Sequence, residues 1–142
     1  MAIYPSGPLK FVWQYLSSTL TNFKVKLLGY RTYRALLTQT VISTAPTAIV
    51  LENTIDPTLT WTVGGSGDYS INCQSPAFNN SSKVTVIIGL SAVSGGIGSA
   101  SGFFSNYEIL SSTNLGLYTV DSTLFPIDGV LNNTEFTIKV YL

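Results

Sequence analysis

The chain has 142 residues, its seven basic residues balance its seven acidic ones, and it contains one cysteine and no histidine. Without histidine there is no Ser-His-Asp or Cys-His catalytic relay and no histidine-ligated metal site, and one cysteine cannot form an intrachain disulfide. Charged residues make up only 10% of the chain while Ser and Thr number 17 each, so hydroxyl groups cover the polar faces and we expect other subunits to cover apolar surface.

The chain begins with residues 1–9, whose prolines and glycine predict an irregular arm. Residues 10–16 (KFVWQYL) follow, and in them Phe11, Trp13 and Tyr15 occupy every second position. This period of two predicts a strand with three aromatic side chains on one face. Such a face needs an apolar partner.

Two further strands are expected before residue 40. Residues 17–22 (SSTLTN) resemble a turn-rich link, and the alternation resumes at residues 23–28. Residues 30–39 alternate again, with a short helix at residues 33–37 as the alternative. This helix has no capping residue, so the strand is the preferred interpretation.

The clearest local signal is a β-hairpin in the middle of the chain. Threonine alternates with apolar residues at 58–63, and residues 68–73 alternate in the same way up to Cys73. Between them, residues 64–67 (GGSG) can adopt the positive φ angles of a tight reversal. We expect Cys73 to be a buried apolar residue, and we expect a further strand at residues 48–51.

The second half of the chain predicts more strands and one long loop. The β-branched run at residues 83–90 is typical of a strand buried on both faces. Residues 91–102 are rich in glycine and serine, which predicts a flexible surface loop. The remaining strands are expected at residues 103–110, 116–120 and 135–142.

These elements predict an all-β protein, an antiparallel β-sandwich of jelly-roll-like type with eight to ten short strands and no long helix. The longest apolar run, residues 84–93, is too short for a membrane span. We divide the chain into residues 1–29, an arm with aromatic and basic attachment strands, and residues 30–142, the sandwich domain.

Charge is distributed unevenly along the chain. The segment before residue 35 has a net charge of +5 and the remainder a net charge of −5. One interpretation is that the basic residues are the solvated faces of ordinary strands. The other is that they dock on an acidic surface of a neighbouring subunit or scaffold, whereas a nucleic-acid partner would require a net basic excess. The five basic residues are Lys10, Lys24, Lys26, Arg31 and Arg34.

Few residues indicate catalysis. The carboxylate pairs Glu52/Asp56 and Asp121/Asp128 have the chemistry of a glycosidase, but Asp56 precedes proline and Asp128 precedes glycine, which is typical of turns. Trp13 and Trp61 with the eight tyrosines are the candidates for a sugar-stacking surface, although aromatic residues at strand period more often lie in a core or an interface. We expect no enzyme activity and no cofactor.

Several segments resemble a small β-domain found in virion proteins of phages that infect Bacteroidota. The resemblance covers residues 30–142 and rests on residues 33–39 (YRALLTQ), 45–48 (APTA), 50–54 (VLENT), 60–61 (TW), 67–69 (GDY), 128–131 (DGVL) and 138–141 (IKVY). It implies a virion surface role such as head decoration, vertex, spike or fibre component. Residues 1–29 lie outside the resemblance and would form the attachment segment.

The sequence therefore leads to the hypothesis of a phage virion structural protein, a homo-oligomer (trimer or pentamer) that also contacts other capsid proteins. The expected interface residues are Phe11, Trp13, Tyr15, Lys10, Lys24, Lys26, Arg31 and Arg34. The alternative is a module that binds carbohydrate, such as a host surface glycan, or a host receptor.

Overall fold

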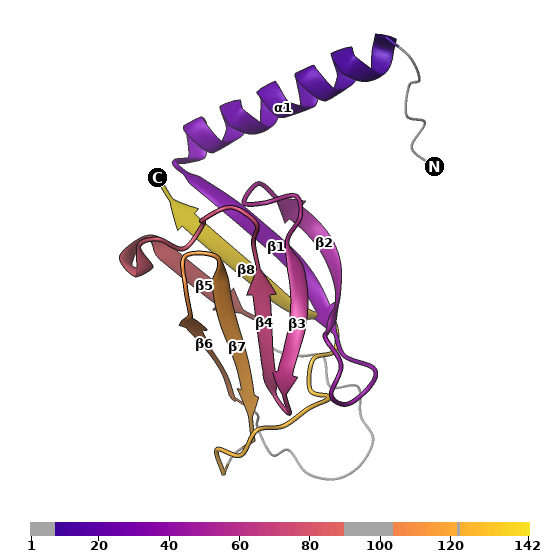
Figure 1. Ribbon diagram of the computed structural model, residues 1–142, viewed down its shortest axis with the longest axis vertical. Helices are drawn as coiled ribbons and strands as arrows, with labels where there is room; N and C mark the ends of the chain where they lie inside the picture. The colour runs from indigo at the N-terminus through magenta and orange to yellow at the C-terminus, as the bar shows by residue number, and fades with distance from the viewer. Residues whose placement is uncertain (1–7, 90–103, 122) are drawn as a thin grey trace.

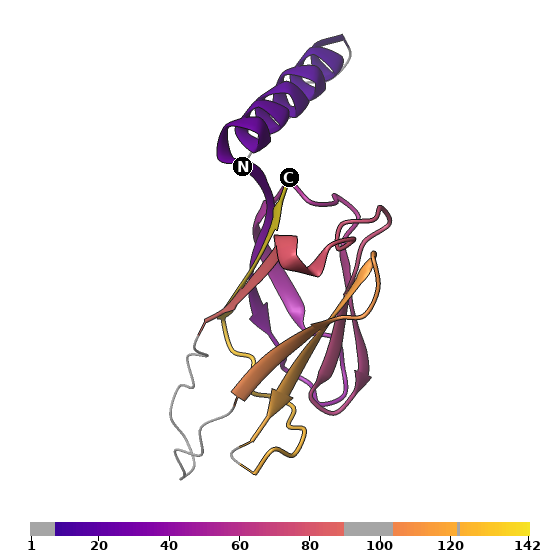
Figure 2. The ribbon, with the colours of Figure 1, turned by 90° about the vertical axis from the view of Figure 1, so that its left-hand side faces the viewer.

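The computed structural model describes residues 8–89, 104–121 and 123–142. These residues form one long helix, α1 (Pro8–Leu28), followed by eight strands in two antiparallel four-stranded sheets. The C-terminal end of the helix lies next to the C-terminus of the chain, and the helix rises obliquely across one end of the sandwich and packs on neither sheet (Figures 1 and 2). Its middle shares an open hollow with the loop after β2 (Thr47–Asn53), lined by Ser17, Ser18, Thr21, Asn22, Asn53, Thr54 and Pro57. The predicted all-β sandwich is confirmed for the part of the chain after Gly29.

The prediction of strands at residues 10–16 and 23–28, joined by a turn, was wrong, as was the expectation that no long helix exists. Residues 8–28 form a single helix. The turn formers do not interrupt it because their hydroxyl groups donate back to carbonyl oxygens one turn earlier: Ser17 to Gln14 (3.0 Å), and Ser18 and Thr19 to Tyr15 (both 2.9 Å).

The first sheet has the strand order β2-β1-β8-β5. Its central strands β1 and β8 pair along their length, from Tyr30 opposite Tyr141 to Leu37 opposite Thr134. The C-terminal strand is therefore paired within a sheet, as its apolar pattern predicts. The strands are β1 (Tyr30–Thr38), β2 (Thr47–Asn53), β5 (Val84–Ile88) and β8 (Thr134–Tyr141).

The second sheet has the order β3-β4-β7-β6 and consists of two hairpins joined through β4 and β7. The predicted central hairpin is confirmed, because β3 pairs with β4, and Gly67 in its turn has a φ of 64°. The jelly-roll form is not confirmed by these strand orders. The strands are β3 (Thr60–Gly65), β4 (Asp68–Asn72), β6 (Phe104–Ile109) and β7 (Asn114–Val120).

The core lies between the two sheets and contains side chains from both. Tyr33 and Phe136 from the first sheet are buried with Tyr69 and Leu117 from the second. Trp61 closes this layer, since its Nε1 donates to the Tyr33 hydroxyl at 3.0 Å and its ring lies edge-on to Phe136 at 5.1 Å. No described residue of α1 belongs to this core, so the sandwich buries its apolar layer without the helix.

The structure also tests the predicted burial of Cys73 and of the strand at residues 83–90. Cys73 is buried, as predicted. The strand predicted at residues 83–90 is confirmed as β5, but its predicted burial on both faces was wrong, because β5 lies at the edge of its sheet and Ile87 is half exposed. Of the predicted irregular arm at residues 1–9, Pro8 and Leu9 belong to α1, so the prediction was wrong there. Residues 1–7 and the predicted loop at residues 91–102 lie outside the described residues.

Candidate functional site: the exposed helix

The aromatic residues predicted to share one strand face lie on α1 and do not share a face. Phe11 and Tyr15, 74% and 71% exposed, are four residues apart and so lie on one side of the helix. Trp13, 57% exposed, lies two residues from each of them and therefore faces the opposite side. The predicted interface residues remain at the surface, but they divide into two faces.

Sequence reasoning missed a second set of residues, which Trp13 joins. These side chains recur at intervals of three and four residues along the helix, and all are exposed to solvent. We call this set the seam of α1. Its spacing was readable from the sequence as the helical period, but the aromatic alternation over seven residues obscured it. The seam consists of Trp13, Leu16, Leu20, Phe23 and Leu27.

The seam has a hollow on its surface. Trp13, Leu16, Ser17 and Leu20 line a depression of about 210 Å³ that is open to solvent. Three of these four residues belong to the seam, and Ser17 borders it. The hollow is therefore a shallow apolar site on the free helix.

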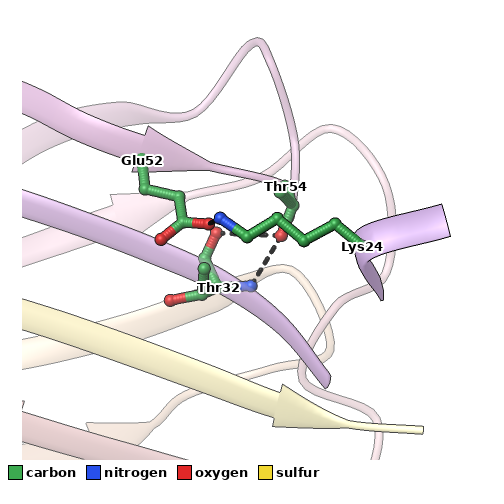
Figure 3. Close-up of polar contacts among 4 residues, drawn as sticks. All are labelled: Lys24, Thr32, Glu52 and Thr54. Atoms are coloured by element: carbon green, nitrogen blue, oxygen red, sulfur yellow. Dashed lines mark hydrogen bonds and ion pairs between the residues drawn. The ribbon is translucent and has the colours of Figure 1, made fainter. Parts of the chain in front are cut away.

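The junction between α1 and the sandwich is held by one turn and one ion pair. Gly29 ends the helix with a φ of 71°, a conformation that glycine adopts without strain, and its carbonyl accepts from the N–H of Leu142 at 3.1 Å. Lys24 pairs with Glu52 of β2 across the space between the helix and the sheet (Figure 3).

Hydrogen bonds beside this ion pair fix the loop after β2. The N–H of Thr32 donates to the Thr54 hydroxyl at 2.7 Å, and the N–H of Thr54 donates to the carbonyl of Thr32 at 2.7 Å (Figure 3). Because β2 is held to β1 in this way, Glu52 presents a fixed carboxylate to Lys24. Exposed ion pairs contribute little stability, so this contact orients the helix more than it stabilises the fold.

The basic residues predicted to form one docking surface are dispersed. Lys24 pairs with Glu52, and Arg34 donates from Nε to Glu135 at 2.7 Å on the outer face of the first sheet. Arg31 is half-buried on the opposite side of β1 from Arg34. Lys26 is exposed on α1, and Lys10 lies in its first turns. Two of the five positive charges are thus matched by acids of the same chain.

The carboxylates considered for glycosidase chemistry hold loops together. Asp56 accepts from Thr58 through both the N–H (2.9 Å) and the hydroxyl (2.6 Å), and from the N–H groups of Gln74 (2.7 Å) and Ser75 (3.0 Å). The hydrogen bonds from Thr58 contribute most to lowering the pKa of Asp56 to about 2. Asp121 accepts in the same manner from Thr123 and from the Phe125 N–H.

Asp128 lies at the centre of a polar cluster at the end of the sandwich away from α1. Its carboxylate accepts from the N–H groups of Gly67 (2.9 Å) and Ser43 (3.1 Å), and the Tyr69 hydroxyl lies 2.8 Å away. Burial alone would raise the pKa of Asp128, but these hydrogen bonds and one from Gln39 lower it to about 2. The carboxylate is therefore charged and fully engaged in linking three loops.

The outer face of the first sheet carries another hollow, of about 350 Å³, lined by charged, hydroxyl and apolar side chains, with polar and apolar surface in similar measure. It contains the Arg34–Glu135 ion pair, and Lys139 lies 5.0 Å from the centre of the Tyr30 ring. Trp61, a candidate for stacking on sugars, packs instead on the core residues Tyr33 and Phe136. Among the described tryptophan and tyrosine side chains, only that of Tyr30 lines this hollow.

Within the described ranges, no cluster of His, Cys, Asp and Glu side chains has the size of a metal site. In the same part of the chain, neither α1 nor η1, a 3-10 helix at Ser81–Lys83, is long and apolar enough to cross a bilayer. Comparison of the chain with protein-family models, curated proteins and solved structures gave no match. The helix is therefore interpreted from its own chemistry.

Proposed function

We propose that this protein is a structural subunit of a phage virion, a capsid-associated decoration, vertex or spike, or fibre component that acts by assembly and not by catalysis. The observation that carries the proposal is α1, a 21-residue helix with large apolar side chains in solvent beside a sandwich whose core is complete without it. A soluble chain keeps such a surface when a partner covers it.

The virion setting rests on the resemblance of residues 30–142 to a β-domain of phage particle proteins. In this setting the sandwich is the exposed body, and α1 holds it to neighbouring copies and to other capsid proteins. Trp13 supplies apolar contacts to neighbouring copies, and Phe11 and Tyr15, on the opposite side of the helix, supply apolar contacts to other capsid proteins. Lys10, Lys26 and Arg31 supply positive charge that could meet an acidic capsid surface.

The proposal is tested by particle incorporation. Particles are assembled in host cells that supply either the tagged full chain or a tagged chain lacking residues 1–29, and the purified particles are probed for the tag. We expect the full chain in the particles and at least a tenfold loss for the shortened chain. Incorporation of the shortened chain at the full level would exclude α1 as the attachment segment, and absence of both chains would exclude the virion role.

The hollow on the first sheet favours one alternative, a module that binds a host glycan or receptor. Its paired charges and the Tyr30 ring offer hydrogen bonds and one stacking face to a sugar. Titration of the full chain with soluble host surface glycans, followed by NMR of the Tyr30 and Lys139 signals, distinguishes the two functions. Saturable shifts at these residues would support the module, and unchanged signals would exclude the hollow.

A further inference from the structure

We propose that α1 associates in parallel and in register with α1 of other copies of this chain, as a coiled coil closed along its seam. This inference rests on the proposed function in that it names the partner of the same helix. It commits to an identical helix as the occupant, whereas the function requires only that some partner covers α1.

The spacing of the seam is that of a heptad repeat. Trp13, Leu20 and Leu27 are seven residues apart, and Leu16 and Phe23 fall between them at the same interval of seven. They therefore occupy the a and d positions of a coiled coil. The a/d spacing is that of a helix–helix contact, and the seam is part of a wider apolar surface that includes the exposed Phe11, Val12 and Tyr15.

The hollow on the seam has the composition of a coiled-coil hole. In a parallel coiled coil, each d side chain inserts into four residues of the facing helix: the preceding a, the opposite d, the next residue e, and the following a. Trp13, Leu16, Ser17 and Leu20 are these four residues, and they line the observed depression of about 210 Å³. Leu16 of an identical helix in register is the side chain that faces it.

The residues bordering the seam permit this pairing. Ser17 and Thr19 are small and uncharged, and Thr19 is the residue that faces Lys24 of a parallel copy across the seam. Lys24 is already paired with Glu52 of its own chain. Among the described residues of α1 there is therefore no like-charged pair opposed along the parallel seam.

The position of the helix favours the parallel arrangement. The helix, about 31 Å long by its rise per residue, leaves the sandwich at Leu28 and extends away from it (Figure 1). Parallel copies place all sandwiches at one end, which matches a closed cyclic assembly on a symmetric particle. None of the a positions carries the β-branched residue that favours two strands, so the seam does not specify a dimer.

The test uses the full chain and two matched double variants. Leu16→Gln/Leu20→Gln alters the seam, and Phe11→Gln/Tyr15→Gln alters the opposite face with the same number of apolar-to-Gln changes. Native mass spectrometry and light scattering measure the mass across a range of concentrations. We expect three or five times 15.3 kDa for the full chain and the Phe11/Tyr15 variant, and 15.3 kDa for the seam variant.

Orientation is measured by disulfide cross-linking. Leu27→Cys places thiols at the sandwich end of the seam, where only parallel copies bring them together, and Ser18→Cys places them on the outer face as a control. Burial raises the pKa of native Cys73 to about 11, which keeps this thiol unreactive. We expect cross-linked chains for Leu27→Cys and none for Ser18→Cys. An oligomer that does not cross-link at Leu27→Cys would overturn the parallel arrangement.

Other outcomes separate this inference from the proposed function. A full chain that is monomeric at every concentration, or a seam variant that keeps the oligomeric mass, would overturn the inference. If incorporation into particles still requires α1 in that case, the proposed function stands with a different capsid partner. A monomer that sediments with vesicles of equal parts phosphatidylcholine and phosphatidylglycerol, and loses this binding in the seam variant, would assign the seam to a membrane surface instead.

Discussion

At the scale of single residues, the polar cluster around Asp128 makes stability depend on acid. The pKa of Asp128 is about 2 in the folded chain and near 3.8 when unfolded, so its contribution is complete above pH 4 and is lost as the pH falls towards 2. The pKa of Asp56 is also lowered to about 2, so its contribution to stability is lost over the same range of pH. We expect Asp128→Asn to lower the free energy of unfolding at pH 7 by about 1–2 kcal/mol.

Urea unfolding at pH 7, 4 and 2 measures both quantities. The Asn variant should approach the wild-type stability as the pH falls to 2, because the Asp128 carboxylate is then protonated in the unfolded wild-type chain and about half protonated in the folded one. A variant that stays less stable by the same amount at every pH would show that shape, and not charge, is what Asp128 contributes.

Gly67 is a second single residue on which the fold depends. Its φ is 64°, and a Cβ at this position would overlap the carbonyl oxygen of Thr119 and lie 2.8 Å from the backbone nitrogen of Ile127. We expect Gly67→Ala to destabilise the chain by about 3 kcal/mol or more, since neither backbone group can move independently. Gly65→Ala is the matched control, because nothing lies within 4 Å of its Cβ position and its φ is not positive. Thermal unfolding of the two variants should separate them clearly, and equal midpoints would contradict this account.

At the scale of elements, the strands were predictable and the helix was not. The hairpin β3–β4 was readable because alternation, glycine in the turn and a buried Cys73 all indicate one structure. In α1 the local signals conflict: aromatic alternation and hydroxyl-rich residues indicate strands and a turn, whereas the seam indicates a helix. Its ends were readable too, since Pro8 stands at the first helical position and Gly29 directly after the last. The strand prediction rested on a window of seven residues, and a hydrophobic period of 3.6 can be distinguished from a period of 2 only over several helical turns.

The helix is also energetically separate from the sandwich. The side chains of α1 from Phe11 to Phe23 are all exposed. The contacts described above between the helix and the sandwich are the turn at Gly29 and the Lys24–Glu52 ion pair. Ser18→Pro removes a backbone donor in mid-helix, which costs about 3 kcal/mol in the helix. We therefore expect far-UV circular dichroism to lose helical signal and the oligomer to dissociate, while the unfolding midpoint of the sandwich changes little. Ser18→Ala is the control, and a lowered midpoint in the proline variant alone would show that the helix supports the sandwich.

At the scale of the whole molecule, the division at Gly29 predicts that the sandwich is an independent folding unit. The buried core runs from Tyr33 to Val140 and includes no described side chain of α1. Removing residues 1–29 costs the exposed Lys24–Glu52 ion pair, worth at most about 1 kcal/mol, and the hydrogen bond from the Leu142 N–H to the Gly29 carbonyl. A chain of residues 30–142 should therefore unfold cooperatively with a free energy close to that of the full chain, and it should be monomeric because the seam is gone.

The outer edges of the sheets decide whether that monomer persists. Ile49, Val50 and Leu51 are each about half exposed on the edge strand β2, the strand nearest α1 through Glu52. If these residues pair with β2 of another copy in the assembly, the shortened chain will still self-associate. In that case Val50→Lys will abolish the association, and the seam variant of the full chain will stay oligomeric.

If the seam alone drives assembly, the shortened chain remains at the mass of one chain at all concentrations. Val50→Lys in the full chain then leaves the oligomer intact. Light scattering on these chains thus locates the contact on the helix or on the sheet edge, and we expect the helix, because its seam is continuous whereas β2 is interrupted by a bulge opposite Arg34 and Ala35.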